Sequence, residues 1–174
     1  MNGKIPIAIG MAIAVLLQIL LAPVITIGSA MPDFVLAYSI ALAFAGKGRT
    51  FYLTAFLGGL AFDLVGYSPV GAMAAVCVLA MFACSTVVRN AGGDGIAIPL
   101  VMIAVSCIVF ECIYGFLMMA CGIDVALLDA FAFRILPCAL YDIVIAIAAY
   151  LLLARFVFGD RNANEMTIIE GGLD

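Results

Sequence analysis

The sequence predicts an all-α membrane protein that forms a single bundle of six transmembrane helices. Of its 174 residues, 68% are hydrophobic and 10% are charged, and the mean hydropathy is +1.34. Soluble domains are about half apolar and about a quarter charged. Because one span needs about 20 apolar residues, the chain has room for about six helices joined by short turns.

Turn signals divide the apolar sequence into six candidate spans. The expected spans are residues 5–27, 34–45, 51–65, 69–88, 96–121 and 131–158. They form one transmembrane domain, residues 1–158, and a polar cytoplasmic tail, residues 159–174, follows it. The first span also resembles a signal peptide, since residues 28–30 are small. Its apolar run is longer than a normal signal sequence, so we expect a retained helix.

Glycine, proline and threonine set the expected helix ends. The second and third spans are short, and we expect them to pack as an antiparallel hairpin around residues 46–50, with Thr50 as N-cap. Ser68 and Pro69 resemble the N-cap and first position of the fourth helix. Pro137 cannot donate a hydrogen bond to the carbonyl of Phe133, which predicts a kink early in the sixth.

The basic residues predict the orientation in the membrane. With a cytoplasmic N-terminus, Arg134 lies outside, and the other basic residues lie inside: Lys4, Lys47, Arg49, Arg89, Arg155 and Arg161. This asymmetry follows the positive-inside rule. Both termini are therefore expected in the cytoplasm.

Three acidic residues lie within apolar spans and are candidate functional groups. Asp63 and Glu111 are each about 21 Å along their helices, so they could meet Arg134 near the outer face. Asp142 lies near the midplane, where we expect a neutral acid or a hydrogen bond from a hydroxyl group. These groups either line an ion or substrate path or fix helix register. The sequence favours register, since it shows no internal repeat of a transporter kind.

The composition excludes several kinds of chemistry. The chain contains no His and no Trp, and its six Cys lie in apolar runs without metal-binding spacing. No nucleophile with a base and no metal cluster is recognisable, so we expect no enzymatic activity, no cofactor and no metal. A nucleic-acid partner is not expected either.

Small residues predict close helix contacts. Gly58 and Gly59 flatten the third helix one turn before Asp63, and Ala55 with Gly59 and Gly71 with Ala75 have small-xxx-small spacing. Such a face can receive a helix of this chain, of a partner, or of a second copy in a homodimer.

Three patches of the sequence resemble the MreD family of rod-shape-determining membrane proteins. The first is Pro32-Asp33. The second joins the Gly58, Gly59 and Asp63 segment to the turn that contains Pro69 and Gly71. The third is the stretch 136–142, where Asp142 stands in place of the family's usual Asn. The patches are separated along the chain, and the family's length and helix number match the whole of it.

The resemblance implies a non-enzymatic, multi-pass protein of the bacterial inner membrane that takes part in cell elongation. The implied partner is an MreC-like bitopic protein. Through it the chain would be linked to an MreB-like filament, RodA and a class B penicillin-binding protein in peptidoglycan synthesis. The implied fold is similar to that of the S components of energy-coupling-factor transporters.

The alternative function is an S-component-like substrate-binding subunit of a vitamin transporter. Ala8 and Ala12 on the first helix have the spacing of the helix-docking motif that such subunits use. Asp63, Glu111, Arg134 and Tyr114 are the polar groups that an outer-facing pocket could contain.

Overall fold

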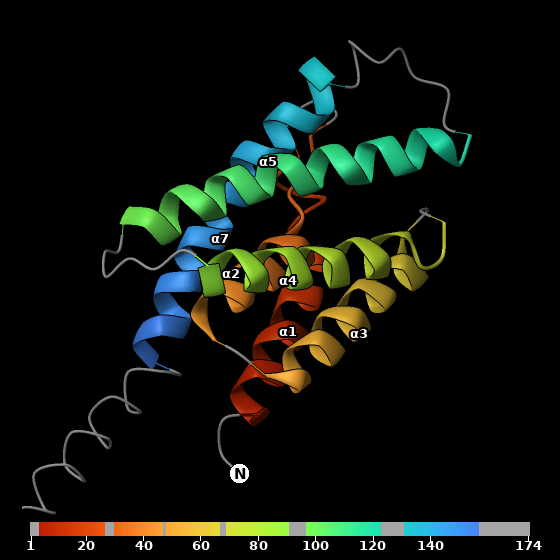
Figure 1. The fold of residues 1–174 in the computed structure, drawn as a ribbon. Helices are drawn as coiled ribbons and strands as arrows, with labels where there is room; N and C mark the ends of the chain where they lie inside the picture. Colours follow the sequence, from red (N-terminus) through yellow and green to blue (C-terminus); the bar gives the residue numbers. More distant parts are fainter. Residues whose placement is uncertain are drawn as a thin grey trace, which may run out of the picture.

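The computed structural model is all-helical in the part of the chain that it describes. This part comprises residues 4–26, 30–46, 48–66, 69–90, 97–122 and 131–156. Its helices are α1 (Lys4–Leu20), α2 (Phe34–Ala45), α3 (Arg49–Val65), α4 (Ala72–Asn90), α5 (Ala97–Ala120), the π-helical turn η1 (Phe131–Ile135) and α7 (Leu136–Phe156). The six α-helices lie where the sequence predicts helices, and Figure 1 shows their arrangement.

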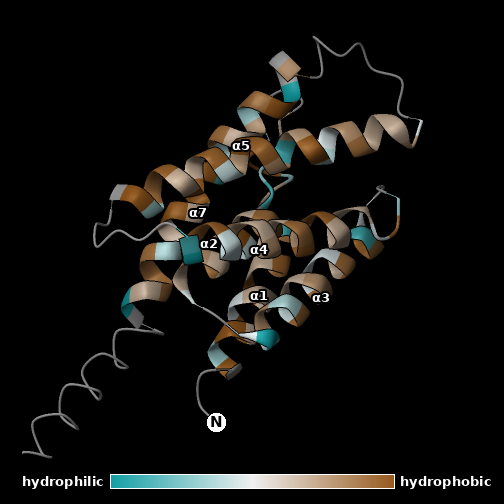
Figure 2. Cartoon of the chain, viewed as in Figure 1, coloured by the Kyte–Doolittle hydropathy of each residue, from teal (hydrophilic) through white to brown (hydrophobic). Residues whose placement is uncertain are grey.

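Three helices are long and apolar enough to cross a membrane. They are α4, α5 and α7, judged by length and composition. Figure 2 shows hydrophobic residues along most of the helical surface. Large apolar side chains are exposed on every long helix, among them Leu79, Val105, Phe116 and Val144. A surface of this kind is stable in lipid and unstable in water.

The short helix α2 lies at the centre of the bundle. It contacts all five other α-helices, and all residues from Phe34 to Ala43 are buried. In Figure 1, α2 lies behind α4, with α1 and α3 below them. Its twelve residues are too few to cross the hydrocarbon unaided. Because other helices surround α2, neither lipid contact nor full span length is required of it.

The expected hairpin of α2 and α3 is not the main contact of either helix. These helices do touch, but α2 packs mostly against α7 and α4, and α3 packs mostly against α4 and α1. The hydropathy of two short apolar runs cannot distinguish these arrangements, because lipid-facing and helix-facing surfaces are equally apolar.

Several predicted helix ends are wrong by a few residues. The first helix ends at Leu20 rather than at residue 27, since Pro23 disfavours helical backbone in the residue before it. The N-cap of α3 is Gly48, not Thr50, whose carbonyl accepts a hydrogen bond from the Thr54 hydroxyl inside the helix. Ser68 lies outside the described residues.

The fourth helix begins at Ala72 rather than at Pro69. The amide of Ala72 donates to the carbonyl of Pro69 over 3.1 Å. Between them Gly71 has a φ of +98°, which L side chains rarely adopt. Gly71 is therefore the turn before the helix, and Ala75 is exposed, so these two residues do not form a helix-packing pair.

A π-helical turn precedes Pro137, the residue at which the sequence predicts a kink. The turn η1 ends at Ile135, and α7 continues from Leu136. The missing amide hydrogen at residue 137 removes a helical hydrogen bond in this region. The helix consequently widens before the proline.

Gly59 allows α3 and α4 to approach closely. A Cβ atom built at this residue would lie 2.6 Å from the Cα atom of Ala74. The obstacle is backbone, which cannot rotate away. Gly58, the neighbouring glycine, faces the flexible side chain of Met11 on α1 instead.

Substitution of Gly59 tests this close approach. Gly59→Ala should destabilise the protein by about 1–3 kcal/mol, since α4 must move away. Thermal unfolding in detergent measures the change. Gly48→Ala is the control, because its added Cβ would meet only Phe51 at 3.6 Å. Equal unfolding temperatures for the two variants would contradict this account.

Candidate functional site

The N-terminus of α2 is held by an amide side chain of α1. Gln18 is buried, and its Oε1 atom accepts a hydrogen bond of 2.7 Å from the amide of Phe34. Its Nε2 atom donates to the carbonyl of Pro32 over 3.0 Å and to Oδ1 of Asp33 over 3.3 Å. One glutamine therefore satisfies both backbone and side-chain groups where α2 begins.

Asp142 of α7 binds the backbone amide of Asp33, the residue before Phe34. Its Oδ1 atom accepts a hydrogen bond of 2.7 Å from the amide of Asp33, 109 residues away in the sequence. The expected partner was a hydroxyl group on another helix; the partner is instead a backbone amide. Asp33 itself occupies the N-cap position of α2, but its side chain makes no capping hydrogen bond to that helix.

Three carboxylates meet at this place. Asp33, Glu111 and Asp142 each offer an oxygen atom, and these atoms all lie within 4.8 Å of one another. They come from the segment before α2, from α5 and from α7. All three residues are buried, with exposed fractions of 5%, 4% and 0%. We call these three residues the carboxylate cluster.

Two oxygen atoms of the carboxylate cluster have no hydrogen-bond partner among the described residues. They are Oε2 of Glu111 and Oδ2 of Asp142. A buried charge or polar atom without a partner is costly. The exposed guanidinium of Arg134, in η1, interacts electrostatically with Asp33 and Glu111. The cluster therefore needs positive charge, protons, or both to be stable, because like charges this close repel one another.

Asp63 is not part of the carboxylate cluster. Its Oδ2 atom accepts hydrogen bonds from the amides of Gly71, over 2.9 Å, and Ala74, over 3.2 Å. Its Oδ1 atom accepts one from Met73 over 3.1 Å. Asp63 is 2% exposed and thus caps α4 from α3. This geometry gives Asp63 the role of fixing two helices together.

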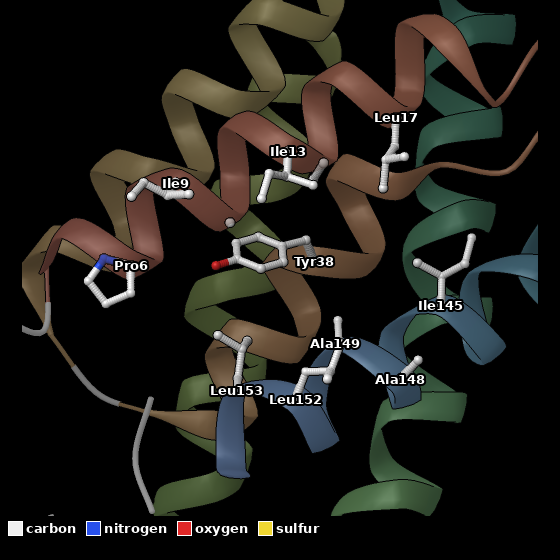
Figure 3. Close-up of a pocket in the computed structure, with 12 residues that line it drawn as sticks. Pro6, Ile9, Ile13, Leu17, Tyr38, Ile145, Ala148, Ala149, Leu152 and Leu153 are labelled. Atoms are coloured by element: carbon white, nitrogen blue, oxygen red, sulfur yellow. The ribbon is translucent and has the colours of Figure 1, made fainter. Parts of the chain in front are cut away.

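A groove separates α1 from α7 on another side of the bundle. It has a volume of about 470 Å³ and is almost entirely apolar. Figure 3 shows Tyr38 of α2 between the two walls. The walls are residues Pro6, Ile9, Gly10, Ile13, Ala14 and Leu17 of α1 and Ile145, Ala148, Ala149, Leu152 and Leu153 of α7.

Tyr38 forms the floor of this groove and fixes it to α1. Its hydroxyl donates a hydrogen bond of 3.0 Å to the carbonyl of Ile7. The ring fits only because residue 10 is glycine, since a Cβ atom there would collide with the tyrosine hydroxyl. The groove is therefore a fixed feature of the packing of α1 on α2.

The sequence identified Glu111, Arg134 and Asp142 as intramembrane polar residues but did not identify Asp33 or Gln18. The structure brings Glu111, Asp142 and Asp33 together, with Arg134 close enough to interact with two of them. Asp33 resembles an ordinary N-cap in the sequence, and Gln18 is one amide within an apolar run. The sequence signals Asp33 only as part of the Pro32-Asp33 patch that resembles the MreD family, and Gln18 only by its position late in the first apolar run.

Comparisons with known proteins add nothing to this geometry. No family model, curated protein or solved structure matches the chain.

The role of Asp63 as the cap of α4 can be measured with two variants. Asp63→Ala removes the acceptor of three amide groups and should lower the free energy of unfolding by about 2 kcal/mol. Asp63→Asn keeps one acceptor oxygen and should lie between Asp63→Ala and the wild type. Thermal unfolding in detergent gives the order. Equal unfolding temperatures in all three proteins would exclude a capping role.

Proposed function

We propose that this chain acts as an MreD-like, non-enzymatic membrane platform in the elongation machinery of a rod-shaped bacterium. In this proposal it crosses the cytoplasmic membrane six times, with both termini in the cytoplasm. It binds an MreC-like bitopic protein and through it reaches the MreB-like filament, RodA and a class B penicillin-binding protein.

One observation carries this proposal. The first and third patches that resemble the MreD family are 109 residues apart in the sequence and meet in the structure, and the two parts of the second patch contact each other. Asp142 of the third patch accepts a hydrogen bond from Asp33 of the first. Within the second, Asp63 accepts one from Gly71, beside the close contact of Gly59 with α4. The contact between the first and third patches supports the interpretation of them as parts of one motif.

The groove between α1 and α7 is the surface that suits the partner best. Its lining residues recur at helical spacing on both walls, and on α1 they extend from Pro6 to Leu17, about 16 Å. Ala14, Ala148 and Ala149 are small lining residues that leave room for close approach. Small residues of this kind are typical of helix contacts in membranes. A bitopic protein has one transmembrane helix, which this groove can receive.

The transporter subunit remains the second candidate because of one observation on α1. Ala8 and Ala12 are both exposed, so the docking spacing that they form is open to another protein. The carboxylate cluster is buried and offers a vitamin-sized molecule no comparable opening. We therefore favour the platform function over the transporter subunit.

A substitution in the groove tests the proposed partner. Ala148→Phe fills the groove, so the partner helix can no longer bind there. Co-purification of the MreC-like protein should fall at least about ten-fold, and rod-shaped cells should become round. Ala75→Phe, at an exposed alanine of α4 outside the groove, is the control and should change neither readout.

Three other outcomes would contradict parts of this proposal. Undiminished co-purification with Ala148→Phe would move the partner to another face. Rods that persist after deletion of the gene would contradict the proposed function, and growth restored by an added vitamin would favour the transporter subunit.

The proposed orientation is tested by labelling of introduced cysteines. In a cysteine-free background, Lys47→Cys should be protected from a membrane-impermeant maleimide in intact cells, and Arg134→Cys should react. The reason is that basic turns remain in the cytoplasm. Labelling of residue 47 from outside would reverse the topology.

A further inference from the structure

The carboxylate cluster suits a cation better than any other occupant. Oxygen ligands from carboxylates are those that hard cations such as Mg²⁺, Ca²⁺ and Mn²⁺ prefer. The cluster supplies three carboxylates from three separate parts of the chain, all of them buried. Exposed acidic groups often gather without a ligand, but acids removed from water and forced together require a compensating charge.

The two unpartnered oxygen atoms are an independent indication. Oδ1 of Asp142 and Oδ1 of Asp33 already accept hydrogen bonds, from the Asp33 amide and from Gln18. Oδ2 of Asp142 and Oε2 of Glu111 accept none and are inaccessible to solvent. These oxygens remain for a ligand, and the hydrogen bonds to the neighbouring atoms hold the carboxylates of Asp33 and Asp142 in place. Such support of a ligand by its surroundings is usual in metal sites.

Charge and distance favour a divalent ion of the size of Ca²⁺. When ionised, the three carboxylates carry three negative charges, which the nearby Arg134 offsets only in part. A divalent cation among them would offset two more. All three oxygen atoms lie within 4.8 Å of one another, so one cation can contact them together. Ca²⁺ accepts irregular arrangements of carboxylate oxygens, whereas Mg²⁺ demands a near-ideal octahedron and usually keeps several waters, which a buried site does not supply.

We propose that Asp33, Glu111 and Asp142 bind one Ca²⁺-sized divalent cation and that this ion joins α5 and α7 to the start of α2. The site goes beyond the proposed platform function and does not depend on it. It makes the stability of the bundle respond to divalent cations.

The test uses the full chain, purified in detergent, treated with EDTA and then freed of the chelator. Addition of about 5 mM Ca²⁺ should raise the unfolding temperature by about 5 °C or more, since a ligand of the folded state stabilises it. Potassium chloride at the same ionic strength should not. Equilibrium dialysis with radioactive Ca²⁺ should show about one ion per chain.

Two variants test whether the Ca²⁺-dependent rise in unfolding temperature comes from the carboxylate cluster. Glu111→Gln and Asp142→Asn keep the shape and one acceptor oxygen of each side chain, and Asp142→Asn can still accept from the Asp33 amide. Both should lose the Ca²⁺-dependent shift and bind Ca²⁺ at least about ten-fold more weakly. Asp63→Asn, which removes a buried carboxylate outside the cluster, should keep the shift from its own lower starting temperature.

Dialysis on the folded fraction recovered by gel filtration keeps the test valid if a variant is less stable. No Ca²⁺-dependent shift in the wild-type protein would overturn the proposal, because the cluster would then be neutralised by protons alone. An equal shift in the wild type and in both cluster variants would also overturn it, since the ion would bind elsewhere.

Discussion

The structure depends on satisfying the first backbone amides of a helix that is buried on every side. The amide groups of Asp33 and Phe34 lie where α2 begins, surrounded by other helices and out of reach of water. Asp142 of α7 and Gln18 of α1 accept their hydrogen bonds. The partial positive charge of a helix N-terminus favours a carboxylate there. Because these acceptors come from two different helices, α1, α2 and α7 are fixed relative to one another by the same few atoms.

A carboxylate from a neighbouring helix also binds the first backbone amides of α4. Asp63 of α3 accepts hydrogen bonds from the amides at the start of α4, and Gly59 on the same helix removes the side chain that would keep α4 away. Neither lipid nor a dry bundle interior provides hydrogen-bond partners for unpaired amides, so each such group must find one within the protein. Asp63 and Asp142 therefore each have a structural role as acceptors of backbone amides. The carboxylate cluster, to which Asp142 also belongs, differs in that two of its oxygens remain without a partner among the described residues.

The sequence was sufficient to predict where the helices lie, and insufficient to predict which of them touch. Apolar runs and turn residues placed all six α-helices, with α2 at the residues expected. Hydropathy could not show that α2 is central, because a helix inside the bundle and a helix in lipid are equally apolar. Asp33 and Asp142 are 109 residues apart in the sequence, so no local sequence pattern predicts the hydrogen bond between them. Depth along a helix allowed Asp63, Glu111 and Arg134 to meet near the outer face, but depth does not determine the rotation of a helix about its axis.

The carboxylate cluster and the groove are connected through α7. Asp142 faces α2 and α5, and Ile145, within one turn of it, lines the groove with Ala148 and Ala149. On the other wall, α1 carries Gln18 at the cluster end and Leu17 in the groove. Asp142 accepts a hydrogen bond from the start of α2, so it fixes the helix that carries Ala148 and Ala149 on one wall of the groove. Gln18 does the same for α1, which forms the other wall. The polar groups that satisfy the start of α2 therefore also fix both walls of the groove.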